Sequence, residues 1–270
     1  VHYIPFSEDL SSDSQWKNFE MIIPFFERGD ILTVDITHGY RSIPIYFSAA
    51  INFLQKSKDI KLKHVLYGAF EKKDSSNVAP IIDMKEFYLI NQWADAVNRL
   101  VEDADAAELA DMAEENNSFS IKALNNEKFI NDLRSLSLKV KGVDIHDIAR
   151  YANSVLSYIS NARTEISEIE KILMELIEEK FIALASDNYT KLYDSDYYDL
   201  QIKIIELLLE HELYMQAFTV MREYIASIGM NGLDTSKKKR NRKYAEVFLA
   251  MLRYPQEKWM FKGEDISMKD

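Results

Sequence analysis

The sequence of 270 residues contains no cysteine. Disulfides, thiolate nucleophiles and zinc–thiolate sites are therefore excluded within it, which agrees with a reducing compartment. It also has no apolar run near the roughly 20 residues that a membrane-spanning helix needs. Its first residues have neither the basic nor the apolar region of a signal peptide. These absences predict a cytoplasmic protein.

A surplus of positive charge is lacking as well. Acidic residues outnumber basic ones by 44 to 33, which gives a net charge of −11 and a pI near 5.1. Non-specific attraction to nucleic acid depends on a positive surface, so any contact with RNA should be local. The apolar fraction of 47% is large enough for a substantial core in a chain of this length. The sequence therefore predicts a globular protein.

Proline and glycine are scarce after the first third of the chain. No proline occurs between Pro80 and Pro255, and the same stretch holds three glycines. A long stretch with so few helix breakers predicts helices. The apolar periodicity places them at about 87–115, 146–184, 197–228 and 240–253, and the second of these carries an apolar stripe of Ile166, Ile169, Leu173 and Leu176. A polar residue near Asn126 is expected to begin a further helix.

The first part of the chain alternates instead between helix and strand patterns. A helix is predicted at 14–28, and a strand–helix–strand series at 31–37, 43–56 and 64–70 is followed by a short strand at 79–84. Two strands joined by a helix within about 40 residues are typical of a parallel βαβ unit. The predicted fold class is an α/β part followed by an all-α helical part.

The motif DITHGYRS follows the first predicted strand. In an open parallel sheet, ligands bind beyond the carboxyl ends of the strands. Gly39 permits close backbone approach, Thr37 and His38 offer hydrogen bonds, and Arg41 presents a fork suited to phosphate. Asp35 is expected to orient the loop by accepting backbone N–H bonds. The alternative is a helix-capping turn with an exposed arginine, because no Gly-rich phosphate-binding fingerprint accompanies the motif.

The motif DITHGYRSIP, followed by VLYGAFE, resembles the DxTHG family of CRISPR-associated proteins. Members of this family join a Rossmann-like CARF sensor domain to a helical HEPN domain. The segment YMQAFTVMREYIA at 214–226 resembles a helix on the HEPN side. The residues that carry the two motifs are Asp35, Thr37, His38 and Gly39 in the first and Tyr67, Gly68, Ala69 and Glu71 in the second.

The resemblance implies a function in type III CRISPR antiviral defence. A dimer of CARF domains would bind a cyclic oligoadenylate, and the bound ring would activate metal-independent cleavage of single-stranded RNA by the HEPN domains. No cofactor and no metal are expected besides this ring. The implied domains are 1–84, the C-terminal portion of a CARF-type domain, then a connecting helix at 85–125 and an HEPN-like domain at 126–270. The implied ligand-binding residues are Asp35, Thr37, His38, Gly39, Arg41, Tyr67, Gly68 and Glu71.

Two departures from the family pattern bear on these expectations. The chain reaches the first motif by residue 35, so in a CARF domain we would expect about half of the sheet to come before this sequence begins. HEPN ribonucleases use an Arg followed, after four to six residues, by a His, and no Arg of this sequence has such a His. The nearest pair is Arg240 and Glu246, which are the weak catalytic candidates. Either the nuclease is degenerate and the protein is a sensor, or the catalytic helix lies beyond Asp270, and we expect the second.

Other candidate functional residues also have a purely structural interpretation. The basic run at 237–243 either contacts RNA or is a solvated loop. His146, near Asp144 and Asp147, has the residue types of a metal site, but without a distant fourth ligand it is interpreted as a helix start at the surface. His64 and His211 are expected to be structural. The RNA-contact candidates are Lys237, Lys238, Lys239, Arg240, Arg242 and Lys243.

A third class of function is an enzyme of nucleotide metabolism that shares only the loop at the sheet end. Nothing in the helical half supports this class. The function expected first is therefore a ring-nucleotide-gated ribonuclease that acts as a homodimer, with a non-catalytic ring-nucleotide sensor as the alternative.

Overall fold

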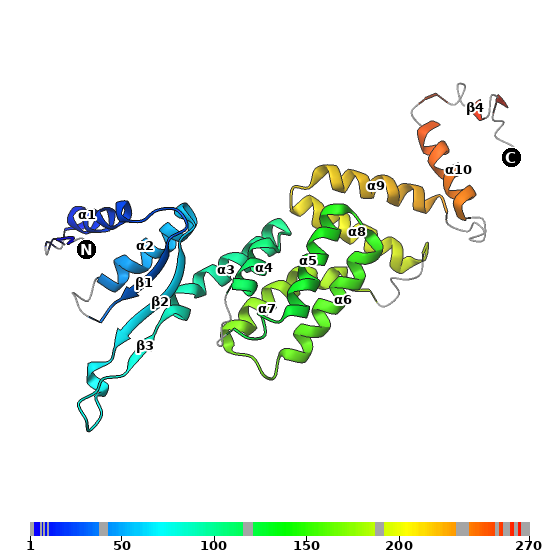
Figure 1. The fold of residues 1–270 in the computed structure, drawn as a ribbon. Coiled ribbons are helices and arrows are strands. Elements are labelled where there is room, and N and C mark those ends of the chain that lie inside the picture. The colour runs from blue at the N-terminus through cyan, green and yellow to red at the C-terminus, as the bar shows by residue number, and fades with distance from the viewer. Residues whose placement is uncertain are drawn as a thin grey trace. The chain divides into compact units, whose positions relative to one another are not determined.

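The computed structural model describes residues 3–5, 7, 9, 11–37, 43–115, 121–186, 192–230, 238–251, 254–255, 260–261 and 264–265. The chain divides into two compact units, residues 1–93 and 94–270. The first unit combines helices with a small mixed sheet, and the second is mostly helical (Figure 1). The predicted combination of a small α/β part and a helical part is therefore confirmed.

The first unit contains a three-stranded sheet in the order β1-β2-β3. Strand β1 (Ile31–Asp35) and strand β2 (Lys61–Gly68) are parallel and are joined by helix α2 (Ile43–Lys58). This is the predicted βαβ unit. Strand β3 (Ile81–Asp83) runs antiparallel to β2, so the sheet is mixed.

A register shift in the parallel pair decides which residues of β2 enter the core. Leu32 pairs with Leu62 and Thr33 pairs with His64, so Lys63 is an extra residue on β2. Without it, strict alternation would place Leu62 and Val65 on opposite faces. The shift lets both face α2, in a core of Val34, Ile51, Leu62 and Val65.

Helix α1 (Ser12–Ile22) is shorter than the predicted helix at 14–28. Ser11 caps its first turn by accepting a hydrogen bond from the N–H of Ser14. A single 3-10 turn follows at Ile23–Phe25, where Pro24 has no N–H for an α-helical bond. The chain then turns at Gly29, whose φ of +83° suits glycine.

The predicted helix at 87–115 is wrong as a single element, because α3 (Lys85–Asp103) and α4 (Ala107–Glu115) are separate. Ala104 between them has a φ of +50°. The buried hydroxyl of Ser137 donates to the carbonyl of Ala104 and accepts the N–H of Ala106 at 3.4 Å. A side chain from another helix therefore satisfies two of the backbone groups that the break leaves open.

The helices that follow are also shorter than the predicted ones. The prediction at 146–184 corresponds to α6 (Ile145–Ala162), α7 (Glu168–Phe181) and a 3-10 turn at Ile182–Leu184, and the prediction at 197–228 corresponds to α8 (Ser195–Glu210) and α9 (Tyr214–Ile228). Helix α7 begins at Ser167, which forms a reciprocal capping box with Glu170. Ile169 is 44% exposed, so the predicted stripe is displaced: the buried residues of α7 are Glu170, Leu173, Met174, Ile177 and Phe181.

The remaining described elements are α5, α10 and a short pair of strands. Helix α5 (Glu127–Gly142) begins at Asn126, whose side chain accepts from the N–H of Phe129, as predicted. Helix α10 (Lys238–Met251) corresponds to the prediction at 240–253, and β4 (Met260–Phe261) pairs with β5 (Glu264–Asp265). Within the described ranges, no helix has both the length and the apolar character needed to cross a membrane.

Candidate functional site

The carboxyl ends of β1 and β2 bring the two sequence motifs together. The strands are parallel, and Asp35 at the end of β1 lies in register with Leu66. The N–H of Ile36 donates to the carbonyl of Leu66 at 2.9 Å, which extends the pairing by one residue. Thr37 is thereby placed beside the last residues of β2, as parallel pairing requires.

A direct hydrogen bond joins the motifs. The N–H of Gly68 donates to Oγ1 of Thr37 at 2.7 Å. The N–H of Thr37 in turn donates to Oδ1 of Asp35 at 2.8 Å, so this carboxylate orients the start of the loop, as expected from the sequence. A Cβ on Gly68 would lie only 3.0 Å from Cγ2 of Thr37. The close approach of the two motifs therefore explains the glycine at position 68.

Tyr67 and Glu71 form a second pair in the later motif. The hydroxyl of Tyr67 donates to the two carboxylate oxygens of Glu71 at 3.1 and 3.2 Å. This hydrogen bond, together with the negative charge of Glu71, raises the pKa of Tyr67 above its ordinary value. The raised pKa keeps the phenol of Tyr67 protonated, and the carboxylate oxygens beside it can accept hydrogen bonds from donor groups of a ligand such as base amines.

His64 and Asp83 anchor β3 to β2. Nδ1 of His64 lies 2.6 Å from Oδ2 of Asp83, whose Oδ1 accepts the N–H groups of Val65 and Lys85 at 3.1 and 3.0 Å. Partial burial raises the pKa of Asp83, but the hydrogen bonds from His64 and the two backbone groups outweigh it and hold the pKa below its ordinary value. His64 thus has the structural role that the sequence predicts.

The predicted ligand site is only partly within the described residues. The structure brings Asp35 and Thr37 beside Gly68, next to the Tyr67–Glu71 pair. His38, Gly39 and Arg41 lie outside the described residues. Ligand binding at this edge remains a prediction.

The basic run of the sequence falls at the start of α10. Lys237 lies outside the described residues, and Lys238 begins the helix. Lys243 is exposed, whereas Arg242 is half-buried and joins α10 to α9. Its guanidinium donates to the carboxylate of Glu223 and, at 2.9 Å, to Oγ of Ser227. Arg242 therefore has a structural role here, and its contact with RNA remains a prediction.

Of the two weak catalytic candidates, the side chain of Glu246 is described and that of Arg240 lies outside the described part. The carboxylate of Glu246 accepts a hydrogen bond from Nε of Arg242 at 3.3 Å, one helical turn away. Arg240 lies in the first turn of α10. Glu246 thus takes part in the same network as Glu223, which accounts for an acid at this position without catalysis.

The acidic residues around His146 form ion pairs with Lys139 and Arg150. Nζ of Lys139 lies 2.7 Å from a carboxylate oxygen of Asp144 and 2.7 Å from one of Asp147. The hydrogen bonds to Asp144 and Asp147 raise the pKa of Lys139, and its bond lowers that of Asp147. No group of three His, Cys, Asp or Glu side chains suited to a metal occurs in the described part of the chain. These contacts favour the interpretation of His146 as part of a helix start.

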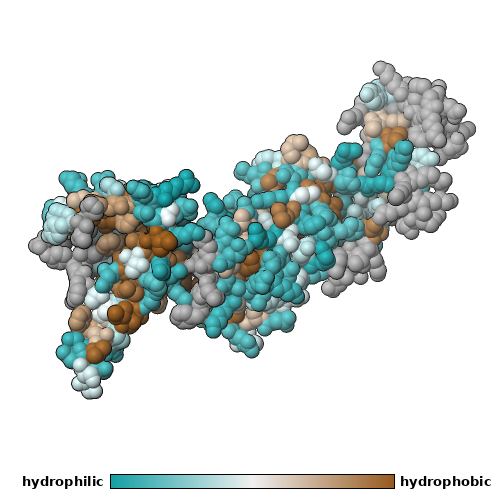
Figure 2. Space-filling view, in the orientation of Figure 1, coloured by the Kyte–Doolittle hydropathy of each residue, from teal (hydrophilic) through white to brown (hydrophobic). Residues whose placement is uncertain are grey.

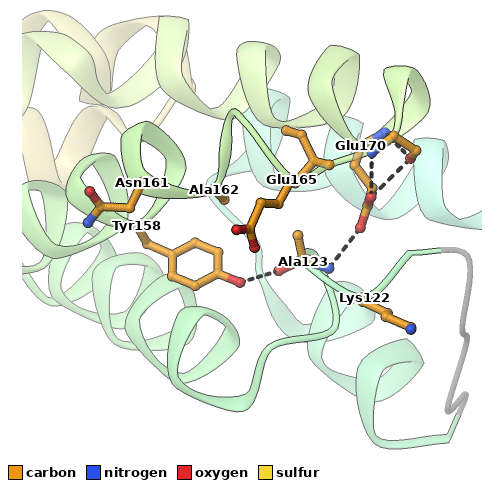
Figure 3. A pocket seen from close by; sticks show the side chains of 9 residues that line it. Lys122, Ala123, Tyr158, Asn161, Ala162, Glu165 and Glu170 are labelled. Atoms are coloured by element: carbon orange, nitrogen blue, oxygen red, sulfur yellow. Dashed lines mark hydrogen bonds between the residues drawn. The ribbon is translucent and has the colours of Figure 1, made fainter.

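The helical unit contains a pocket of about 600 Å³ that the sequence did not indicate (Figure 3). The hydroxyl of Tyr158 donates to the carbonyl of Ala123 at 2.9 Å, and Oε1 of Glu170 accepts the N–H of Ala123 at 2.7 Å. One part of this pocket could have been located from the sequence: Ser167 and Glu170 show the capping-box pattern, in which Ser is followed three residues later by Glu. The lining residues are Lys122, Ala123, Tyr158, Asn161, Ala162, Glu165, Ile166, Ser167 and Glu170.

Comparison with known proteins gives one informative match. No protein-family model matches the chain. Over 225 residues, which are 80% of the chain, the sequence is 23% identical to the CRISPR-associated protein MJ1674 of Methanocaldococcus jannaschii. The match covers 32% of that protein, so the chain spans about a third of the length of this relative.

Proposed function

We propose that this chain is part of an ancillary effector of type III CRISPR defence that senses a cyclic oligoadenylate. The α/β unit corresponds in this proposal to the C-terminal portion of a Rossmann-like CARF domain, and the helical unit to an HEPN-like domain. The ring binds at the carboxyl edge of β1 and β2, in a homodimer formed through the α/β units. Its binding activates metal-independent cleavage of single-stranded RNA.

The observation that carries the proposal is the hydrogen bond from the N–H of Gly68 to Oγ1 of Thr37. It places the two motifs of the family pattern at one sheet edge, where parallel sheets bind ligands. Similarity to a CRISPR-associated protein over 80% of the chain independently supports a role in CRISPR defence. A ring with an even number of phosphodiester-linked adenosines has two-fold symmetry, which suits a site that a dimer presents twice.

The second candidate function is a ring-nucleotide sensor without catalysis. It is favoured by the contacts of Glu246, which occupies the position of the HEPN histidine and is bonded to Arg242. Arg242 is itself held by Glu223 and Ser227. These contacts engage the carboxylate of Glu246 and the guanidinium of Arg242 with each other and with α9.

Calorimetric titration with cyclic oligoadenylates of different ring sizes tests the binding. We expect one ring per two chains, with no binding of the linear oligomers. Arg41→Ala should weaken binding by about 1.5–3 kcal/mol if this arginine donates a charge-assisted bond to phosphate. The matched control is Arg28→Ala, which removes an exposed arginine of the same unit. Equal affinities of the two variants would contradict the assignment of Arg41, and absence of binding for every ring would refute the sensing function.

Cleavage is tested with labelled single-stranded RNA in EDTA, with and without the ring. Because the sequence has no Arg–His pair at the HEPN spacing, we expect the 270 residues to leave RNA intact. Cleavage by these residues would move the site to Arg240 and Glu246, and Glu246→Gln would then abolish it. Ring binding without cleavage, also in any longer form that the gene encodes, would favour the sensor.

A further inference from the structure

The pocket around Tyr158, Glu165 and Glu170 is held in shape by packing and hydrogen bonds of the helical unit itself (Figure 3). We call it the α6–α7 pocket. The ring of Tyr158 stacks on the buried ring of Phe129, with 4.6 Å between the centroids and 23° between the planes. Its hydroxyl donates to the carbonyl of Ala123, whose N–H is bound by Glu170. The volume of about 600 Å³ lies within the range of roughly 300–1,000 Å³ that is typical of small-molecule sites.

Two carboxylates give this pocket an unbalanced negative charge. Glu170 is only 4% exposed, and its three hydrogen-bond donors, the N–H of Ala123 and the N–H and hydroxyl of Ser167, are all neutral. Arg163 lies two residues before Glu165 but pairs with a glutamate of α7 instead. Among the described residues, neither pocket carboxylate forms an ion pair with a Lys, Arg or His side chain. Because a buried charge is costly without an opposite one, the pocket favours a cationic ligand.

The acceptor positions that remain on Glu170 indicate an ammonium group. Oε2 already accepts two hydrogen bonds from Ser167, and Oε1 accepts one from Ala123. A guanidinium fork binds best to both oxygens of one carboxylate, whereas the compact ammonium needs a single acceptor position. In the described part of the chain, no group of three His, Cys, Asp or Glu side chains is suited to a metal. The inner end of the pocket is therefore suited to an amine.

The rest of the lining is suited to an alkyl chain with a second positive charge. Ala162 and Ile166 are half-buried and line the pocket together with Tyr158. Methylene groups can pack on these side chains, and the face of an aromatic ring attracts ammonium groups. Figure 3 shows the exposed Glu165 directed into the pocket, whereas the ammonium of Lys122 points away from it.

We propose that the α6–α7 pocket binds an aliphatic diamine or polyamine, with one ammonium at the inner carboxylate of Glu170 and a second at the outer carboxylate of Glu165. The alkyl chain between the two ammonium groups lies along Ala162 and Ile166. This site belongs to the helical unit alone and does not rest on ring binding or on the proposed ribonuclease activity.

Calorimetric titration with putrescine, a diamine with four methylene groups, tests the site. The chain has a net charge of −11, and the face of the helical unit in Figure 2 is largely hydrophilic, so any cation is also attracted without a specific site. The ionic strength is therefore held constant, and butylamine, which has one ammonium on the same alkyl chain, is the control ligand. We expect one putrescine per chain, bound at least about three-fold more tightly than butylamine, because the outer ion pair is exposed and therefore modest.

Two charge-removing variants separate the site from general attraction. Glu165→Gln keeps the shape of an exposed side chain and should weaken putrescine binding at least about three-fold. It should also abolish the preference for putrescine over butylamine. The matched control is Glu168→Gln, which removes an acid of the same segment that is 87% exposed and lies outside the pocket lining. Equal putrescine affinities of the two variants would show non-specific attraction and overturn the proposal.

A variant that fills the pocket gives a second measurement without a change of charge. Ala162→Leu extends an apolar side chain into the space proposed for the alkyl chain and should weaken putrescine binding about ten-fold or more. Circular dichroism establishes that the variant folds. Unchanged binding in a folded Ala162→Leu would place the diamine elsewhere and refute the site. Absence of binding at millimolar putrescine, or displacement of putrescine by an equal concentration of Mg²⁺, would refute it as well.

Discussion

The Thr37–Gly68 contact can be tested by removing either of its two components. Thr37→Val keeps the shape of the side chain but deletes Oγ1, which accepts the N–H of Gly68 at 2.7 Å. Gly68→Ala keeps the hydrogen bond but adds a Cβ at 3.0 Å from Cγ2 of Thr37 and 3.2 Å from Oγ1. Thr37→Ser is the matched control, because it retains the acceptor and removes the methyl group.

The magnitudes follow from burial and distance. Leaving a buried N–H without an acceptor costs about 1–3 kcal/mol, and Gly68 is half-buried, so we expect the lower part of this range, about 1 kcal/mol, for Thr37→Val. Gly68→Ala requires a shift of a few tenths of an ångström in Thr37 and should cost about 1–2 kcal/mol. Combining it with Thr37→Ser should recover at least 0.5 kcal/mol, roughly the smallest coupling expected of residues in contact.

Native-state hydrogen exchange, followed by mass spectrometry of peptides from β1 and β2, measures these changes within the first unit. Thr37→Ser should match the unaltered chain. If Thr37→Ser destabilises the strands as much as Thr37→Val, the hydroxyl is not the essential group. If Gly68→Ala costs the same in both backgrounds, the methyl group of Thr37 does not limit position 68. Either result would refute the reasoning.

Three further predictions concern titration and the break between α3 and α4. The pKa of Asp83 is held below its ordinary value. Its contribution to the stability of the first unit should therefore be present above about pH 4 and be lost as the pH falls further, through the lowered pKa. The urea midpoint of Asp83→Asn should accordingly depend less on acid pH than that of the unaltered chain. Burial lowers the pKa of His211, which bonds to the carbonyl of Glu102. The second unit should therefore lose stability as the pH falls from about 6.5 toward the lowered value, and His211→Gln should remove this loss in thermal melts. Ser137→Ala should cost about 1–3 kcal/mol in urea unfolding, because the buried carbonyl of Ala104 would lack the Ser137 hydroxyl; an unchanged midpoint would contradict this.

The local apolar pattern of the sequence was sufficient to predict the class of fold and the sheet edge at which the candidate ligand site lies. Alternation over 31–70 predicts strand, helix and strand, and two parallel strands necessarily end at the same edge. The juxtaposition of Asp35 and Thr37 with Gly68 follows from that topology alone. The structure adds the atoms that join them, since the bond between Thr37 and Gly68 links positions far apart in the chain.

Contacts distant in sequence decided where the helices end. No glycine or proline lies near Ala104. Asp105 caps α4 locally by accepting the N–H of Ala107 at 3.0 Å, but the hydroxyl of Ser137, which bonds to Ala104 and Ala106, comes from the distant helix α5. The partners of Arg242 are equally distant, because Glu223 and Ser227 belong to α9. Sequence periodicity predicts apolar positions, but it does not identify the group on another helix that satisfies a particular carbonyl or guanidinium.

Helix α9 shows most clearly the difference between what the sequence predicts and what the tertiary structure decides. Its sequence is apolar on two sides, so composition and spacing alone indicate a helix without indicating which side is covered. The hydrophobic effect is not directional, and either side could be buried. In the structure α9 packs against α8, and Ala217 and Val220 are buried whereas the large side chains of Met215 and Phe218 are exposed. Only the tertiary structure therefore shows which side of α9 is exposed.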